Sequence, residues 1–212
     1  MIYWVGVEDI EPNRWVAWSF DRPGLTGKGT TSEAAVAHLQ TLLPDGELLV
    51  AEEFAGFLSP QDAEYIVNAF FEDDRRPLSS AEVNTALDEL IVTRRDFLAQ
   101  LADVPPDILN RPIPGELFGS IAGIVHHVGS GERFYHQRLD ATVQWEPLPA
   151  DPFEVIAAAR ATTNAYFPTL VGDTRITVLV DEMWSARKVL RRTLWHERDH
   201  TDHIAQRLRE LT

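Results

Sequence analysis

The fold of this chain is decided by residues 184–204, which read WSARKVLRRTLWHERDHTDHI. From Trp184 to the C-terminus the sequence has no Pro or Gly, and Arg, Leu, Ala and Glu are frequent. These residues lose little side-chain freedom in a helix, so the stretch predicts one long helix from about Trp184 to Thr212. The rest of the chain must supply the surfaces against which this helix packs.

Three histidines lie along one side of this predicted helix. His196, His200 and His203 are spaced at i, i+4 and i+7, which places their side chains on one helix face. Neutral imidazole is the commonest metal ligand in proteins, so the spacing indicates a metal site. His196 and His203 are about 10 Å apart along the helix axis, too far to share one ion easily with His200. We therefore expect His196 and His200 to be ligands, and His203 to lie at the rim, either facing the substrate or supporting a ligand.

Composition and charge narrow the class of protein. The chain has 212 residues, of which 44% are hydrophobic and 25% charged, as in ordinary globular proteins. Its net charge of −14 disfavours nucleic acid and anionic membrane as partners. Neither a run of about 18 apolar residues nor a basic segment before the apolar N-terminus is present, so we expect a cytoplasmic protein. Because the sequence has no Cys, any metal must be held by His, carboxylate or water.

Residues 1–58 predict a small α/β module of order β-β-(β)-α-β. A helix is expected after Thr30, which forms a capping-box pattern with Glu33, and it is expected to stop before Pro44. β-forming residues and turn residues alternate around this helix. The expected strands, of which the third is either a strand or a loop, cover residues 2–7, 14–20, 25–29 and 48–54.

This module resembles the HicB-like family of small partner-binding domains. The resemblance rests on a Pro-Gly pair, a Gly-rich loop and the start of the helix, and the matching residues are Pro23, Gly24, Gly29, Thr31, Glu33 and Ala34. It implies a domain that packs on the rest of the chain or binds a protein partner. We assign no catalytic residue to this part of the sequence.

Residues 59–78 are expected to link this module to a helical domain. A short helix capped within residues 59–62 is expected to reach Phe71. The charged run that follows ends at Pro77, and we interpret it as solvated surface.

Residues 79–212 predict an all-α, up-down four-helix bundle, so the fold class is α+β. Ser79 and Glu82 form a capping box, after which apolar residues recur at helical spacing for about 22 residues. Pro-rich connections separate the later helices, and the four expected ranges are about 80–101, 115–139, 153–167 and 184–212. Several glycines of the second range either weaken that helix, by about 1 kcal/mol each, or allow close packing.

The second predicted helix supplies the third candidate ligand. His127 lies next to the apolar stripe of that helix, whereas His126 and His136 are expected to be structural or exposed. With His196 and His200, His127 gives three protein nitrogens and an open fourth position, which is typical of a catalytic metal site. Helix bundles build such sites from side chains on facing helices.

These motifs resemble the DinB/YfiT-like proteins over the whole predicted bundle. The resemblance rests on His127 with Glu132 five residues later, and on Trp184 ahead of the pair His196 and His200. It implies a four-helix bundle, commonly dimeric, in which three histidines hold a divalent metal. Characterised relatives include thiol S-transferases and a thiol-dependent isomerase, so the resemblance also implies a low-molecular-weight thiol as a co-substrate.

The sequence departs from this family after the last ligand. The family often has Arg-Gly-Gln there, whereas this chain has Thr201, Asp202 and His203. His203 is therefore a candidate catalytic residue on the substrate side. Glu197 or Glu132 is expected to orient a ligand or to act as a base, unless it is a solvated carboxylate on the helix face.

We therefore expect a metal-dependent transferase or hydrolase that acts on a small substrate, with His203 and Glu197 as catalytic residues. The all-His ligand set His127, His196 and His200 suits zinc or nickel first, and iron or manganese next. Because the chain has no Cys, a reacting thiol would have to be a small co-substrate. Homodimerisation is implied by the family resemblance.

Three other interpretations stay open. The residues from His196 to His200 also match the H-E-x-x-H motif of zinc metalloproteases, but the further ligand that those enzymes take downstream is missing before Thr212.

The bundle can instead hold a structural metal while the N-terminal module binds a protein partner. A closed site with four ligands would favour this non-catalytic interpretation. Finally, the histidines can form a polar core network without metal.

Overall fold

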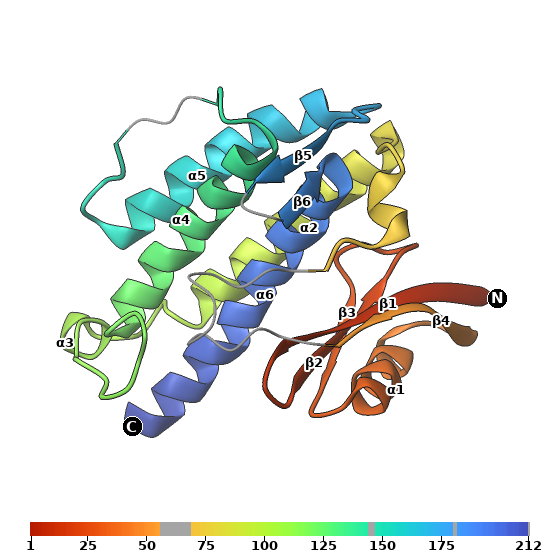
Figure 1. Ribbon diagram of the computed structural model, residues 1–212. Helices are drawn as coiled ribbons and strands as arrows, with labels where there is room; N and C mark the ends of the chain where they lie inside the picture. The colour runs from red at the N-terminus through yellow and green to blue at the C-terminus, as the bar shows by residue number, and fades with distance from the viewer. Residues whose placement is uncertain (56–68, 144–146, 180–181, 212) are drawn as a thin grey trace.

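The computed structural model describes residues 1–55, 69–143, 147–179 and 182–211. It confirms the α+β class, because a small β-sheet module is followed by a region built mainly from helices (Figure 1). The short helix expected between residues 59 and 71 falls mainly outside the described residues. None of the described helices combines the length and the apolar character that crossing a bilayer needs.

The N-terminal module contains a four-stranded sheet. Its strands are β1 (Ile2–Glu11), β2 (Arg14–Ser19), β3 (Thr26–Gly29) and β4 (Glu47–Phe54), in the spatial order β3-β2-β1-β4. β1 and β2 form the expected hairpin, whose turn places Asn13 at a φ of 59°, a conformation that Asn tolerates better than most residues. β4 returns parallel to β1, so the predicted element order is confirmed, with the third segment a true strand.

One helix of the module, α1 (Ser32–Leu42), covers one face of the sheet. Its N-cap is Thr31, which accepts a hydrogen bond from the backbone N–H of Ala34, so the expected start at Thr30 was wrong by one residue. The helix lies so close to β3 that a Cβ on Gly27 would be 2.1 Å from a backbone oxygen of α1. Glycine is therefore needed where the helix crosses this strand.

Four long helices build the second part of the molecule, as predicted. They are α2 (Ser80–Ala99), α4 (Ile121–Leu139), α5 (Pro152–Tyr166) and α6 (Ala186–Leu211). The predicted capping box of Ser79 and Glu82 is present at the start of α2. Shorter elements connect these helices, namely η1 (Glu72–Arg75), α3 (Pro106–Leu109), η2 (Phe167–Leu170), β5 (Ile176–Leu179) and β6 (Glu182–Ser185).

Two of the long helices start later than predicted. α4 begins after Ser120, which accepts a hydrogen bond from the backbone N–H of Gly123. Gly115 and Gly119 both have a φ of +78° and lie in the preceding loop, where this left-handed conformation favours glycine. α6 begins two residues later than expected because Trp184 belongs to strand β6.

The order of the helices includes a crossover that the simple up-down prediction lacked. α4 and α5 run parallel: Gly129 packs on Val155, and Glu132 further along α4 meets Arg160 further along α5. α6 runs antiparallel to α4 (Figure 1). Parallel neighbours need a connection that returns along the bundle between the end of α4 and the start of α5.

The helix α6 lies between the sheet and the other long helices (Figure 1). Trp18 of β2 packs on Trp195 of α6 with ring centroids 5.7 Å apart, and Phe71 packs on Phe20 beside them. The sheet is therefore covered by α1 on one face and by α6 on the other. This position explains why α6 is buried along most of its length.

Four basic residues of α6 are almost fully buried, namely Arg187, Lys188, Arg191 and Arg192. Arg187 pairs with Glu82 of α2 and Lys188 with Glu182 of β6. Arg191 donates to both oxygens of Asp74 at 2.7 and 2.8 Å, and Arg192 pairs with Glu8 of β1. A buried charge without a partner is costly, so the last two ion pairs fix how the module sits on α6. Asp74 belongs to the charged run that we interpreted as solvated surface, which was wrong for this buried residue.

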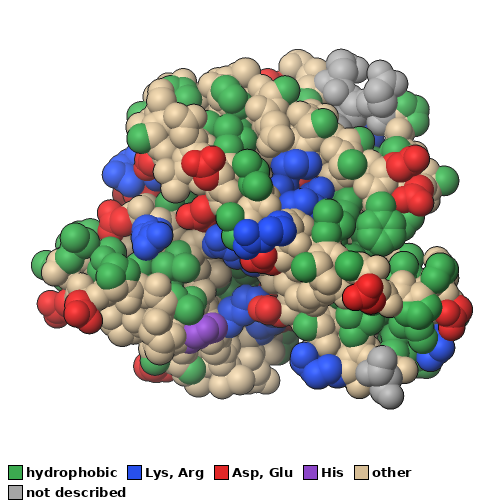
Figure 2. Space-filling model, turned by 180° about the vertical axis from the view of Figure 1, so that it is seen from behind, with side chains coloured by type: hydrophobic (Ala, Val, Ile, Leu, Met, Phe, Trp, Pro, Cys, Tyr) green, Lys and Arg blue, Asp and Glu red, His purple; other side chains and the backbone are tan. Residues whose placement is uncertain are grey.

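The outer surface carries charges of both signs. Figure 2 shows Lys and Arg side chains gathered toward the middle of the face seen from behind, with Asp and Glu side chains beside and around them. The acidic excess of the sequence therefore does not make this face uniformly negative.

Candidate metal centre

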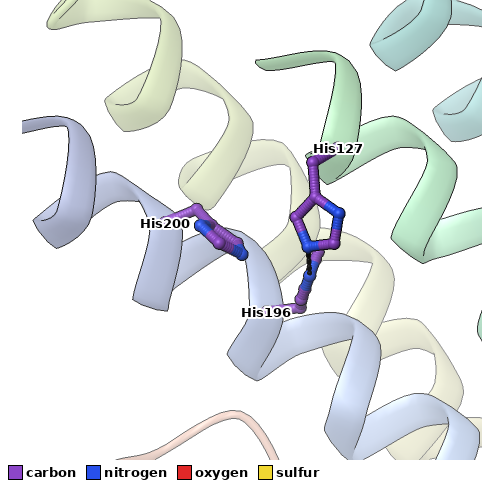
Figure 3. A group of neighbouring side chains, drawn as sticks. All are labelled: His127, His196 and His200. Carbon is purple, nitrogen blue, oxygen red and sulfur yellow. Dashed lines mark hydrogen bonds between the residues drawn. The ribbon is translucent and has the colours of Figure 1, made fainter. Parts of the chain in front are cut away.

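Three histidines from α4 and α6 converge at one place in the bundle (Figure 3). His196 and His200 lie one turn apart on α6, and His127 of the antiparallel helix α4 faces them. One nitrogen from each ring lies within 4.8 Å of the others, and the Nε2 atoms of His127 and His196 are 3.1 Å apart. This histidine cluster can hold a metal ion, and it brings together the three residues that the sequence predicted as ligands.

Residues next to the histidine cluster leave space for its rings and hold them in position by packing. A Cβ on Gly131 would lie 2.5 Å from Cε1 of His196, so glycine is needed beside that ring. Phe118, in the loop before α4, stacks on His127 with ring centroids 3.9 Å apart and planes 19° apart. Close packing is thus the role of this helical glycine, a question that the sequence left open.

Burial keeps the three rings neutral. It lowers the pKa of His127 to about 4 and that of His200 to about 3, and it lowers the pKa of His196 well below the usual value. The nearness of other histidines adds to each shift. At pH 7 each ring therefore offers a lone pair and carries no charge that would repel a cation. Three neutral nitrogens that face one another fit a divalent ion, which would satisfy all of them at once.

A cavity of about 1220 Å³ lies beside the histidine cluster. It is large enough for a small molecule. The bundle contributes an aromatic part of the wall, made by Phe118, Phe134, Tyr135 and Trp195. The N-terminal module contributes Glu11, Arg14 and Lys28, although no sequence pattern assigned residues of that module to a site.

The module is attached to α6 beside the ligands by ion pairs. Asp199, one residue before His200, is paired with Arg14 of β2 and with Lys28 of β3, whose Nζ is 3.1 Å away. Burial raises the pKa of Asp199, but Lys28 and Arg14 outweigh this effect and leave the pKa below its usual range. Lys28 also reaches Asp202 at 2.6 Å. The hairpin and the third strand are thus held against the helix that carries two of the histidines.

His203 lies at the rim of the cavity, as expected, and contacts one of the ligand rings. Its Nδ1 atom is 3.3 Å from Nδ1 of His200, and its Nε2 atom is 2.9 Å from Oε2 of Glu116. Glu116 lies in the loop before α4 and was not predicted as a site residue. A single acidic residue in a loop rich in Pro and Gly gives no local signal of such a role.

Glu197 and Glu132 point into a different part of the bundle. Both are almost fully buried, and each is paired with Arg94 and with Arg160. We call these four residues the arginine–glutamate cluster; it takes one residue from each long helix. The position of Glu197 differs from the expected catalytic role and also from a solvated carboxylate. It also weakens the metalloprotease interpretation, which needs this residue as a base at the metal.

The two remaining histidines of α4 lie outside the histidine cluster. His136 is buried, its Nε2 atom is 3.3 Å from the hydroxyl oxygen of Thr163, and burial lowers its pKa to about 3. His126 is partly exposed. Both positions agree with the expectation that these residues are structural or exposed.

Comparison with protein-family models supports the family resemblance that the sequence motifs of the bundle indicated. The family model of the DinB superfamily matches residues 89–204, which is more than half of the chain and includes all three residues of the histidine cluster. Searches of the curated proteins and of the solved structures gave no match. The HicB-like resemblance of residues 1–58 stays a prediction. The chain belongs to the DinB superfamily.

Proposed function

We propose that this protein is a metal-dependent enzyme of the DinB type, in which His127, His196 and His200 hold a divalent ion. The observation that carries the proposal is the convergence of three neutral imidazole nitrogens within 4.8 Å, next to a cavity of about 1220 Å³. A structural site would be closed by a fourth protein ligand, whereas these histidines line a cavity that a small molecule can enter.

The chemistry that we propose is thiol S-transfer or hydrolysis of a small substrate. A divalent ion with an open position acts as a Lewis acid and lowers the pKa of a water or thiol that it contacts. The chain has no Cys, so a thiol would be a co-substrate, such as a low-molecular-weight thiol. An all-His ligand set favours zinc or nickel, then iron or manganese.

The side chains around the histidine cluster support binding of a substrate with both apolar and polar parts. Phe134, Tyr135 and Trp195 give the cavity an apolar surface beside the histidine cluster. Arg14 and Lys28 bring cationic groups of the N-terminal module to the same cavity. Substrate binding would therefore use both parts of the chain.

The proposal is tested by elemental analysis of the purified protein without an affinity tag. We expect about one divalent ion per chain in the wild type, and less than about 0.1 in His127→Ala and in His200→Ala. His126→Ala is the matched control, because it removes the neighbouring imidazole of α4 that lies outside the histidine cluster, and it should keep the metal. Circular dichroism should show that all variants stay folded.

A wild type without metal, even after incubation with zinc or nickel, would contradict the proposal. The histidines would then form a core network. If the metal is present, assays of thiol transfer to small electrophiles should show turnover that His200→Ala loses and His126→Ala keeps.

A further inference from the structure

A chain of contacts joins the histidine cluster to a carboxylate at the edge of the bundle. His203 bridges His200 and Glu116 through its two ring nitrogens, at 3.3 and 2.9 Å. Glu116 also accepts a hydrogen bond from Nε of Arg207 at 2.7 Å and one from the backbone N–H of Phe118 at 3.2 Å. Its side chain is 1% exposed, so the carboxylate is held in one position at the end of the chain of contacts.

The chemistry of these groups determines which nitrogen carries each proton. An ionised carboxylate only accepts hydrogen bonds, so Nε2 of His203 donates to Glu116. In the neutral form of His203 the lone pair is then on Nδ1, and in that form the contact with His200 requires the hydrogen to be on Nδ1 of His200. The lone pair of His200 is consequently left on Nε2.

The direction of the His200 ring agrees with this assignment. One of its nitrogens points toward His127 and His196, and the other points away from them (Figure 3). Since Nδ1 is the atom that contacts His203, the nitrogen that faces the other two rings is Nε2. The free lone pair therefore lies on the side where an ion would be held.

We propose that Glu116 and His203 are positioning residues, which keep His200 in the tautomer that metal binding requires. This inference rests on the proposed function, because it takes His200 to be a ligand. A ligand histidine commonly donates its second N–H to a carboxylate, a carbonyl or a water, which fixes the ring and raises its basicity. Here a second histidine stands between the ligand and the carboxylate. His203 acts through His200, which is the supporting role among the two that the sequence left open for it, and not on the substrate.

The first test is the affinity for zinc, measured by competition with a chelator. In Glu116→Gln the side-chain amide can donate to Nε2 of His203, which removes the constraint on its tautomer. In His203→Phe the acceptor for the His200 proton is lost. We expect the Kd for zinc to rise about 10- to 100-fold in both variants. His126→Gln, which changes a histidine outside these contacts, should stay within about twofold of the wild type.

The second test does not depend on metal. Nitrogen NMR of the metal-free protein with labelled histidine distinguishes the two tautomers of each ring. We expect His200 to carry its proton on Nδ1 in the wild type and to lose this preference in Glu116→Gln and in His203→Phe. If His203→Phe does not fold, Glu116→Gln alone decides the outcome.

Two results would overturn the inference. One is a wild type in which His200 carries its proton on Nε2. The other is a pair of folded variants that keep both the tautomer and the zinc affinity of the wild type. A wild type that binds neither zinc nor nickel would refute the proposed function, whereas the tautomer of His200 would still decide whether Glu116 and His203 control it.

Discussion

The histidine cluster and the arginine–glutamate cluster lie in the same bundle and are built from neighbouring residues. α6 supplies His196 to one and Glu197 to the other, and α4 supplies His127 and Glu132 in the same way. In the arginine–glutamate cluster two cations meet two anions, and both carboxylates also accept from the hydroxyl of a threonine. In the histidine cluster three neutral imidazole rings converge without a charged partner among them, and the Nε2 atoms of His127 and His196 lie 3.1 Å apart.

This difference shows which cluster can bind an ion. A buried polar network whose members are all paired fixes one arrangement of the helices and needs nothing further. Three neutral imidazole nitrogens that converge within 4.8 Å can all contact one cation. The first cluster thus positions the helices, and the second is the one that can bind an ion.

The largest expected effect comes from breaking the paired cluster. Arg94→Met should lower the free energy of unfolding by about 3–5 kcal/mol, because it leaves Glu197 and Glu132 buried with half of their positive partners. Urea unfolding of the metal-free protein measures this change. Arg95→Met is the matched control: its side chain is 70% exposed and pairs with Asp96 at the surface, so the loss should be below about 1 kcal/mol. Equal losses in the two variants would contradict the structural role of the arginine–glutamate cluster.

A smaller effect is expected where α4 passes the ligand rings. Gly131→Ala should lower the free energy of unfolding by about 1–3 kcal/mol, because the added methyl group overlaps the ring of His196. It should also weaken zinc binding, since that ring must move. Gln137→Ala, on the same helix, should change stability by less than about 0.5 kcal/mol. If Gly131→Ala were more stable than the wild type, as helix propensity alone predicts, the close packing would be disproved.

The smallest expected effect is a difference between the two clusters in how their contribution to stability depends on pH. The pKa of His200 is lowered by burial to about 3, against about 6.5 in the unfolded chain. Below pH 6.5 the unfolded chain therefore takes up a proton that the folded ring refuses, so stability falls as the pH drops from 6.5 toward 4. Each such ring contributes at most about 1.4 kcal/mol per pH unit.

The carboxylates respond in a different range. Burial raises the pKa of Glu197, but Arg94 and Arg160 outweigh it, so the pKa lies below the usual 4.5 and this stabilisation is lost only below that value. Urea unfolding of metal-free protein between pH 6.5 and 5 therefore reports mainly on histidines. His200→Gln should show a shallower slope than the wild type there, and an identical slope would contradict a neutral buried ring.

The sequence predicted the elements and the ligands better than it predicted their surroundings. Spacing along a helix without Pro or Gly was enough to place His196 and His200 on one face, and apolar periodicity was enough to add His127. The burial of Arg192 and of Glu197 could not be predicted, because their partners lie far away in the sequence and charged residues are usually exposed. Glu116 was missed for the same reason, since its role depends on contact with a distant helix.

The relative directions of the helices also could not be predicted from local sequence patterns. Apolar periodicity marks where a helix lies but not which way it runs beside its neighbours. The parallel pair α4 and α5 depends on how the loop between them is routed. A connection of this length is compatible both with an antiparallel neighbour and with a return along the bundle. The contacts of Gly129 with Val155 and of Glu132 with Arg160 together show the second.

The sharing of the cavity between the sheet and the bundle has a consequence for how this protein can diversify. The three histidines belong to α4 and α6, whereas Arg14 and Lys28 belong to strands that precede the bundle in the chain. Substitutions at these two positions would therefore change the charge of the cavity wall while the three histidines stay unchanged. The charge of this wall and the identity of the three histidines are thus encoded by separate segments of the chain.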